Sequence, residues 1–302
     1  MAKFVKIATP LFEKEHCCGQ HGAREAVLTE LRETMRKLSK TGLDLLVLSE
    51  GVEAIGMSMD EAESIEKPGE FLKLYMDFAR AEKCHVAGSL KLKDKGRFYN
   101  AIVFIDDRGT PIGSYRKTFL TAGEIDQLLS PGKGAVVVDT KIGRLGGAIC
   151  FDLNFSELRA EYAKLRPDIM VFASMFHGGF VQSAWALECR SFFVSALPFH
   201  GGGILDPLGA PLGITDCYNK VAKAEINLDR VVVHLDFNRQ KFDDIERKYG
   251  KEVRIQIPPN LGPAIIYSNA KNRSAMDIVR EFGLELIDDY FSRMRKKNNN
   301  KR

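Results

Sequence analysis

Residues 143–155 read GRLGGAICFDLNF, and this stretch decides the fold. Residues 145–149 are small and apolar, as expected of a strand that is buried on both faces. The strand ends at Cys150, and a helix is expected to begin near Ser156, whose hydroxyl can cap it. A thiol placed before a helix N-terminus lies near backbone N–H groups, which favour the thiolate. The stretch therefore predicts a reactive cysteine at the end of a buried strand, and the alternative is a cysteine that only packs as a small hydrophobic residue.

Strands and helices alternate along the chain, with hairpins among them, and this pattern predicts an α/β fold with mixed sheets. Strands are expected at residues 4–9, 43–48, 86–92, 99–105, 113–116, 135–140, 145–150, 169–173, 192–197, 203–206, 221–227 and 231–236. Helices are expected at residues 23–40, 68–82, 156–165, 182–190 and 275–294. Beyond residue 237 the composition changes to charged segments that are interrupted by prolines, which indicates a separate C-terminal part.

The net charge of +4 is concentrated at the C-terminus, because the last ten residues, RMRKKNNNKR, carry six positive side chains and no acid. The rest of the chain is slightly acidic, so we expect no nucleic-acid-binding face on the folded body. The first residues alternate like a strand rather than a signal peptide, and no apolar run reaches the roughly 18 residues of a membrane span. Six cysteines without a secretory signal favour free thiols. We therefore expect a cytoplasmic protein that binds neither membrane nor nucleic acid.

Chemically active side chains follow three of the expected strands. Glu50, Lys117 and Cys150 each come at the end of a largely apolar run. Strand ends in α/β proteins present side chains to a cleft, and charged groups at such places are costly to bury unless they pair. A carboxylate, an ammonium group and a thiol can act as base, oxyanion stabiliser and nucleophile. The sequence therefore predicts that the three side chains form one catalytic set.

Three ordered blocks carry a resemblance to a known family. The blocks are LLVLSEG (45–51), GRFYNAIVFIDDRGTPIGSYRKTFL (96–120) and GGAICFDLNFSEL (146–158), and together they resemble the signatures of the nitrilase (carbon–nitrogen hydrolase) superfamily. The likeness continues through WALECRSFFVSA and GGGILDPLGAPLG, so it covers residues 3–237. The resemblance implies a four-layer α-β-β-α sandwich without cofactor or metal, which dimerises through helices and C-terminal segments.

The resemblance also implies roles for individual residues. By position, Glu50 is the general base, Lys117 the cation and Cys150 the nucleophile, while Glu124 is the best candidate for the second glutamate of the family. Residues 1–237 then form the carbon-nitrogen hydrolase domain. Residues 238–302 form a C-terminal helical extension that ends in the basic tail, and we expect it to act as an interface or a clamp.

The expected reaction is hydrolysis of a non-peptide carbon–nitrogen bond, most simply that of a small amide, in a homodimer or higher homo-oligomer. Phe151 and Phe176 are expected to line the substrate pocket, with packing as core aromatics as the alternative, an alternative that is equally good for Phe176. Asn154 stands where many members carry arginine, which in carbamoyl-amino-acid hydrolases binds a substrate carboxylate. Its absence disfavours amino-acid-like substrates. A nitrilase or N-carbamoyl amidohydrolase remains an alternative, as does a catalytically silent scaffold that binds a partner.

Two other groups of residues offer competing interpretations. His16, Cys17, Cys18 and His21 form the sequence HCCGQH, but adjacent cysteines rarely both ligate one ion and no second ligand pair follows, so we expect no metal. His177 in FHGGF could instead activate the thiol as an imidazole base. If Lys117 is the catalytic cation, removing Lys117 should abolish turnover, whereas removing His177 should leave most of it.

Overall fold

The structure is a computed structural model that describes residues 2–12, 23–51 and 61–301. The HCCGQH residues lie outside the described part of the chain, so the structure leaves their interpretation as it was. The chain divides into two compact units, one formed by Val5–Glu225 and one by Met1–Phe4 together with Ile226–Arg302. Each unit is described by itself below. Within the described ranges, none of the helices is long and apolar enough to cross a membrane.

Two six-stranded mixed sheets form the framework of the larger unit. The first has the order β12-β1-β2-β3-β4-β5, with β1 (Phe4–Pro10), β2 (Leu45–Val47), β3 (His85–Asp94), β4 (Arg97–Ile105), β5 (Pro111–Arg116) and β12 (Val221–Asn227). The second has the order β11-β10-β9-β8-β7-β6, with β6 (Val137–Thr140), β7 (Gly143–Ile149), β8 (Ile169–Ala173), β9 (Phe192–Ala196), β10 (Gly203–Leu205) and β11 (Pro211–Ile214). In each sheet three neighbouring strands run parallel, β1-β2-β3 and β7-β8-β9, and hairpins extend the sheet. The predicted mixed α/β fold is confirmed.

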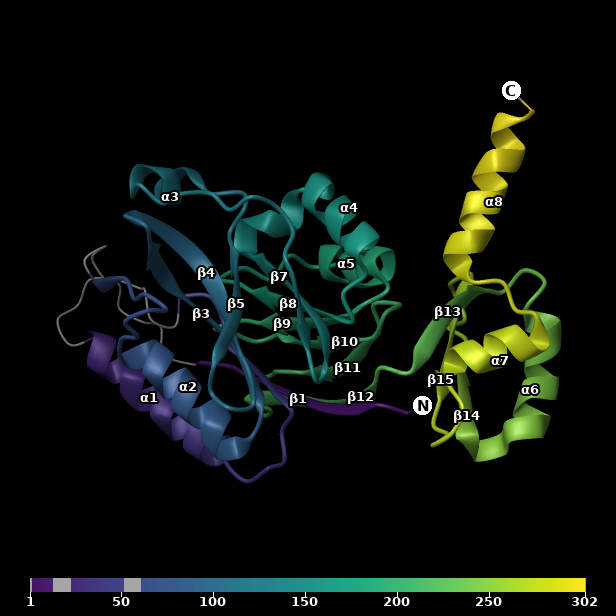
Figure 1. Ribbon diagram of the computed structural model, residues 1–302, viewed down its shortest axis with the longest axis horizontal. Helices are drawn as coiled ribbons and strands as arrows, with labels where there is room; N and C mark the ends of the chain where they lie inside the picture. Colours follow the sequence, from purple (N-terminus) through teal and green to yellow (C-terminus); the bar gives the residue numbers. More distant parts are fainter. Residues whose placement is uncertain (1, 13–22, 52–60, 302) are drawn as a thin grey trace. The chain divides into compact units, whose positions relative to one another are not determined.

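Helices cover the outer faces of the two sheets (Figure 1). Helices α1 (Ala23–Leu38) and α2 (Glu70–Glu82) share one hydrophobic core with the first sheet, while α4 (Ser156–Leu165) and α5 (Val181–Cys189) cover the second. The inner faces of the sheets meet closely at Gly147, where a Cβ atom would lie 2.7 Å from the Cβ of Tyr115. The larger unit therefore has the four layers, helix-sheet-sheet-helix, that the resemblance implies.

The chain enters α4 differently from the sequence expectation. Cys150–Asn154 form a short 3₁₀ helix, η2, and the N-cap of α4 is Phe155, which makes no side-chain capping bond. Ser156 is the first helical residue, so its expected capping role was wrong. The short helix α3 (Ala122–Asp126) lies between the strands expected at residues 113–116 and 135–140, where no helix was expected.

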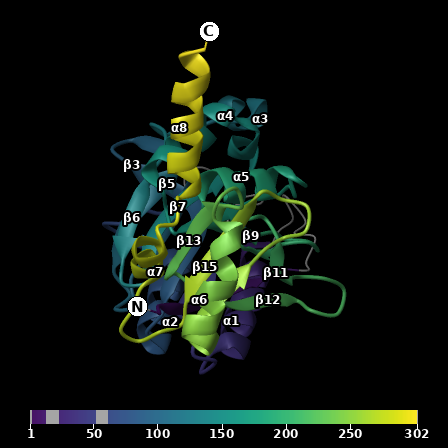
Figure 2. The same ribbon diagram turned by 90° about the vertical axis from the view of Figure 1, so that its right-hand side faces the viewer.

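The smaller unit is built on a three-stranded antiparallel sheet of order β13-β15-β14, parts of which are seen in Figure 2. Its elements are β13 (Arg230–His234), η3 (Arg239–Lys241), α6 (Phe242–Tyr249), η4 (Gly250–Glu252), β14 (Val253–Gln256), β15 (Pro263–Ser268), α7 (Ala275–Phe282) and α8 (Ile287–Asn299). Two expectations were wrong here. The strand near residue 231 belongs to this sheet and not to the main core, and the last helix is two helices, because Gly283 caps α7 with a left-handed φ of 58°.

Candidate active site

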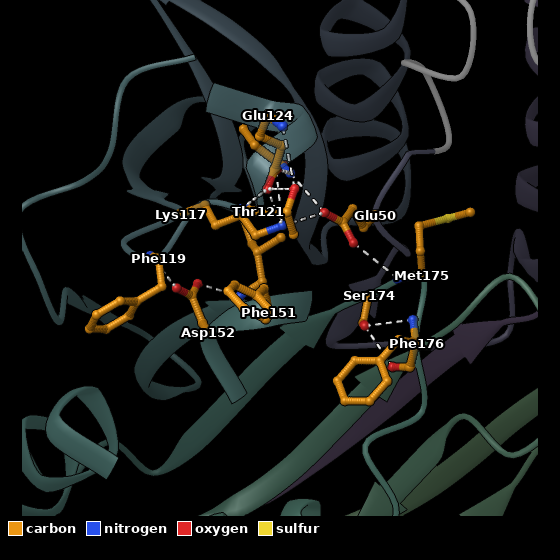
Figure 3. A network of polar contacts seen from close by, with 12 residues as sticks. Glu50, Lys117, Phe119, Thr121, Glu124, Phe151, Asp152, Ser174, Met175 and Phe176 are labelled. Atoms are coloured by element: carbon orange, nitrogen blue, oxygen red, sulfur yellow. Dashed lines mark hydrogen bonds and ion pairs between the residues drawn. The ribbon is translucent and has the colours of Figure 1, made fainter. Parts of the chain in front are cut away.

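Three of the predicted residues follow the strands that position them. Glu50 comes three residues after β2, Lys117 directly follows β5, and Cys150 directly follows β7. Glu124 lies in α3, seven residues beyond the lysine. The structure brings the charged groups together (Figure 3), because Lys117 Nζ lies 3.2 Å from Glu50 Oε1 and 2.9 Å from Glu124 Oε1. The predicted convergence of a carboxylate and an ammonium group is therefore present, with Glu124 as a second carboxylate.

Both carboxylate oxygens of Glu124 accept hydrogen bonds that fix its position. Its backbone N–H donates to Thr121 Oγ1, and the backbone N–H and hydroxyl of Thr121 each donate to Glu124 Oε2 at 2.9 Å. This reciprocal arrangement is a capping box, which starts α3 and fixes the glutamate rotamer. The other oxygen, Oε1, is thereby directed toward Lys117. The short helix therefore places this carboxylate beside the ammonium group.

Asn100 of β4 joins the two carboxylates, and it was not among the residues predicted from the sequence. Its Nδ2 donates to Glu50 Oε1 at 2.7 Å and to Glu124 Oε1 at 2.8 Å. Its backbone carbonyl also accepts a hydrogen bond from the N–H of Lys117 at 2.8 Å. One residue therefore sets the spacing of both glutamates and of the lysine. The only signal in the sequence was its position inside the second resemblance block.

The ionisation states of the lysine and the second glutamate follow from this pairing. Burial alone would lower the pKa of Lys117, but the charges of Glu50 and Glu124 outweigh burial and leave its pKa raised. Burial would likewise raise the pKa of Glu124, but hydrogen bonds from Asn100, Thr121 and Lys117 leave it lowered. At neutral pH Lys117 is therefore an ammonium group and Glu124 a carboxylate, and both side chains are largely removed from water.

Cys150 lies at the end of β7 with a φ of 45°, a left-handed conformation that residues with a Cβ rarely adopt. Burial, and then the charge of Glu50, raise its pKa to about 11, although Lys117, Ser174 and the N–H of Met175 act in the opposite direction. The resting group is consequently a thiol. The helix N-terminus that the sequence predicts to favour a thiolate is outweighed by desolvation and by the neighbouring carboxylate, so the thiol needs a base.

The segment after β8 supplies two further contacts that the sequence did not indicate. The N–H of Met175 donates to Glu50 Oε2 at 3.0 Å, and Ser174 Oγ bonds to both the N–H and the carbonyl of Phe176. Strands β7 and β8 pair in parallel, and Ile149 lies opposite Ala173, so their ends place Cys150 and Ser174 side by side. Glu50 is therefore held at both oxygens, and the thiol has a hydroxyl and an N–H nearby.

Asp152 and Trp185 support the turn that carries the thiol. Asp152 is completely buried and accepts four hydrogen bonds, two of them from the backbone directly after Lys117. Trp185 of α5 is the single tryptophan of the chain, and its indole N–H donates to the carbonyl of Leu153 at 3.0 Å. The turn is consequently fixed on both sides by groups from other elements.

The predicted aromatic residues are partly exposed. Phe151 and Phe176 each retain 37% of their exposure, so neither is a fully buried core residue. The ring of Phe151 meets that of Phe155 edge-on at 5.2 Å, and Phe155 stacks on Phe119 at 3.7 Å. These contacts form a cluster of aromatic rings beside the turn that carries Cys150. A pocket-lining role for Phe151 and Phe176 stays a prediction.

His177 is engaged away from the thiol. Its Nε2 lies 3.1 Å from the carbonyl of Gly201, and its Nδ1 accepts from the N–H of Gly179 at 3.0 Å. Both ring nitrogens therefore have backbone partners, which counts against a thiol–imidazole pair. Among the residues that the structure describes, no group of three or more His, Cys, Asp or Glu side chains could hold a metal ion.

The chain is similar in sequence to known carbon-nitrogen hydrolases. The sequence profile of the carbon-nitrogen hydrolase family matches residues 18–232. A deaminated glutathione amidase of Dictyostelium discoideum is 26% identical over 58% of this chain and 71% of its own. An omega-amidase of Xenopus laevis is 27% identical over 63% of this chain and 72% of its own.

Solved structures share the fold at low identity. Nit3 of Saccharomyces cerevisiae, a member of the nitrilase superfamily, superposes with a TM-score of 0.63 at 19% identity, over 82% of this chain and 95% of that one. An amidase of Nesterenkonia sp. AN1, seen with an acetamide moiety added covalently to its active-site cysteine, gives 0.61 at 17% identity, over 81% and 97%. The chain therefore belongs to the carbon-nitrogen hydrolase family of the nitrilase superfamily and is an enzyme of that family.

Proposed function

We propose that residues 1–237 form an amidase domain that hydrolyses a small non-peptide amide through a thioester on Cys150. The observation that carries the proposal is the ammonium group of Lys117 held between Glu50 and Glu124, next to a thiol whose pKa is raised to about 11. Such a thiol needs a base at the moment of attack, and the carboxylate whose charge acts most strongly on it is that of Glu50.

The reaction follows from these positions. Glu50 takes the proton of the Cys150 thiol as sulfur attacks the amide carbon, and the carbonyl oxygen becomes an oxyanion. Lys117 and the N–H of Phe151 stabilise that oxyanion, which in comparable sites is worth about 3–4 kcal/mol per donor. Glu50 then passes the proton to the departing amine. Water, deprotonated by Glu50, attacks the thioester, and the carboxylic acid leaves as the thiol is restored.

The supporting residues have defined roles in this proposal. Glu124 and Asn100 hold Lys117 and Glu50 at fixed distances before substrate arrives, so no reorganisation is needed during attack. Met175 holds the second oxygen of Glu50. Phe151 and Phe176 line the acyl side of the pocket, and Asn154, an exposed amide in place of an arginine, favours acyl groups without a carboxylate.

The substrate class is tested by ammonia release from a primary amide, an N-carbamoyl amino acid and a nitrile, offered to wild type and to Cys150→Ala. We expect wild type to hydrolyse the amide faster than the other two compounds, and Cys150→Ala to hydrolyse none of them. Preference for the nitrile or the carbamoyl compound would reassign the substrate. Absence of turnover on all three would favour a silent scaffold.

The base is tested separately by labelling with chloroacetamide, an amide that alkylates thiols. We expect Cys150 to be labelled in wild type and much more slowly in Glu50→Gln, whereas Glu188→Gln, an exposed glutamate of α5, should label like wild type. Equal labelling in the first two proteins would remove Glu50 from the role of base.

We also propose that the enzyme acts in the cytoplasm, without cofactor, as a homodimer or higher homo-oligomer. The proposal is supported by the family membership and by the free thiols of Cys84, Cys189 and Cys217, which form no disulfide in the described part of the chain. Sedimentation velocity of the purified protein tests the assembly, and a single species with the 33.8 kDa mass of one chain would refute it.

A further inference from the structure

Asp152 has an unusual position for a carboxylate. It lies two residues after Cys150 in η2, its side chain is completely buried, and the reaction proposed above does not use it. Removal from water disfavours the charge of a carboxylate, so carboxylates are usually buried only where surrounding groups form hydrogen bonds with them. The hydrogen bonds of Asp152 show which groups it holds in place.

Four donors from both sides of the site converge on the Asp152 carboxylate (Figure 3 shows part of this network). Oδ1 accepts from the N–H groups of Thr118 and Phe119, at 3.1 and 2.8 Å, which directly follow the catalytic lysine. Oδ2 accepts from the hydroxyl of Tyr115 at 2.7 Å and from the N–H of Ile149 at 2.9 Å. Oδ1 therefore holds the two residues that follow Lys117, and Oδ2 holds the end of β7, which precedes Cys150.

The bond to Ile149 also closes a ring around Cys150, because donor and acceptor lie on either side of it in sequence. Cys150 has the left-handed φ of 45°, which is maintained only where the surroundings determine it. The hydrogen bonds that Asp152 accepts are such a determinant. Their loss would free the turn and, at the same time, separate the Cys150 thiol from the segment that follows Lys117.

The charge of Asp152 does not serve stability. Burial, the largest influence, raises its pKa from 3.8 to about 6, even though the hydrogen bonds and the charge of Lys117 lower it. The other titratable groups that face it are Tyr115 of β5 and Tyr162 of α4, whose own pKa values are raised. Because ionisation is less favourable in the folded state than in the unfolded chain, the fold would be more stable with this group neutral.

We propose that ionised Asp152 is a positioning residue that fixes the distance between the nucleophile Cys150 and the cation Lys117, through backbone N–H groups on both sides. This inference rests on the proposed function of the site. It assigns to Asp152 no contact with substrate, and it makes the alignment of the two reactive groups dependent on one buried negative charge.

The first test is Asp152→Asn, which keeps the shape but turns an N–H₂ group toward the donors on one side. The measured quantity is the ratio of kcat in the variant to kcat in wild type, as a function of pH. We expect a ratio of about 1:100 near pH 8, typical of a misplacement of about 1 Å, which rises toward one near pH 5 as wild-type Asp152 itself becomes neutral. A ratio that stays constant across this range overturns the proposal.

A matched control is Asp106→Asn. Asp106 is also a buried aspartate, and it accepts hydrogen bonds from the backbone N–H groups of Arg108 and Thr110 in a turn. It directly follows the C-terminal end of β4, whereas Asn100 lies nearer the N-terminal end of that strand. Its pKa is lowered, so its charge is constant between pH 5 and 8. The control should therefore show a ratio that is independent of pH.

The second test is Tyr115→Phe, which removes one hydrogen bond and leaves the carboxylate in place. The tyrosine bond lowers the pKa of Asp152, so its loss raises that pKa further. The ratio of variant to wild-type kcat should be near one at about pH 8 and about pH 5, with a dip in between, where only the variant is neutral. A flat ratio contradicts the role of the charge, even if Asp152→Asn fails to fold.

The same ratios can be measured without turnover, as rates of Cys150 labelling by chloroacetamide, because the intrinsic ionisation of the thiol cancels in the ratio. If the protein hydrolyses no amide, the proposed function fails, and the labelling ratios still decide the inference. Labelling ratios that follow the pH pattern above support it, and ratios independent of pH refute it.

Discussion

Replacing Lys117 with methionine measures separately what the central ion pair contributes to stability and to catalysis. The methionine preserves the length of the side chain but removes the ammonium group from between Glu50 and Glu124, whose side chains are 9% and 14% exposed. Removal of one partner from a buried pair leaves an uncompensated charge and is expected to lower the free energy of unfolding by about 3–5 kcal/mol. If Lys117 is the oxyanion donor that we propose, its loss should lower kcat by about 10²–10³-fold.

The assay is urea unfolding, followed in parallel with kcat, for Lys117→Met and for the control Lys141→Met. Lys141 forms an ion pair with Asp107 at 2.7 Å, but its side chain is 70% exposed, so the control should lose less than about 1 kcal/mol and no activity.

The pH dependence of Lys117→Met gives a second check. The lowered pKa of Glu124 means that its stabilising effect is present above its ordinary value of 4.5 and is lost as pH falls through its folded value. The difference in stability between wild type and Lys117→Met should therefore shrink in acid. A difference below about 1 kcal/mol at neutral pH, or a kcat within threefold of wild type, would refute the reasoning.

Three further predictions concern single side chains. Cys150→Ser should lose turnover, whereas Cys217→Ser, at an exposed thiol, should retain it in the same ammonia assay. Gly147→Ala should destabilise by about 1–3 kcal/mol, because its Cβ would lie 2.7 Å from a tyrosine side chain, while Gly123→Ala meets nothing within 4 Å and should be neutral or stabilising in thermal unfolding. Asp152 binds its proton more tightly in the folded state, with a pKa of about 6 against 3.8, so its contribution to stability should fall by about 3 kcal/mol as pH rises through this interval. Urea unfolding of Asp152→Asn should lack that fall, and an identical pH profile would contradict the raised pKa.

The parts of the fold that the sequence predicted are those that depend on local pattern. Apolar runs predicted β2, β7 and β8, helical periodicity predicted α1, and Pro68 as a first-turn residue predicted α2. The sheet to which a strand belongs depends on long-range pairing. The apolar run of β13 therefore looked like a core strand, although it pairs with β15. The break between α7 and α8 had a local signal, Gly283, but one apolar stripe appeared to continue across it.

The candidate site shows the same division. Glu50, Lys117 and Cys150 could be predicted because reactive side chains at strand ends are unusual, and Glu124 because a resemblance placed it. Asn100 could not, since an asparagine within a strand becomes significant only when two carboxylates meet it in space. The high pKa of the thiol could not be predicted for a related reason. Desolvation and the nearby carboxylate are set by the fold, although the assignment of Glu50 as the base already implied a protonated thiol.

The lone indole of the chain gives this enzyme an optical reporter of its own. Trp185 donates a hydrogen bond to the carbonyl of Leu153, three residues beyond Cys150, so its emission reports on the backbone of the turn that carries the thiol. If Cys150 forms the proposed thioester, a change in this backbone on acylation can be followed by stopped-flow fluorescence without a dye. Since α5 belongs to the larger unit, the same signal follows the melting of that unit while the smaller one stays spectroscopically silent in tryptophan emission.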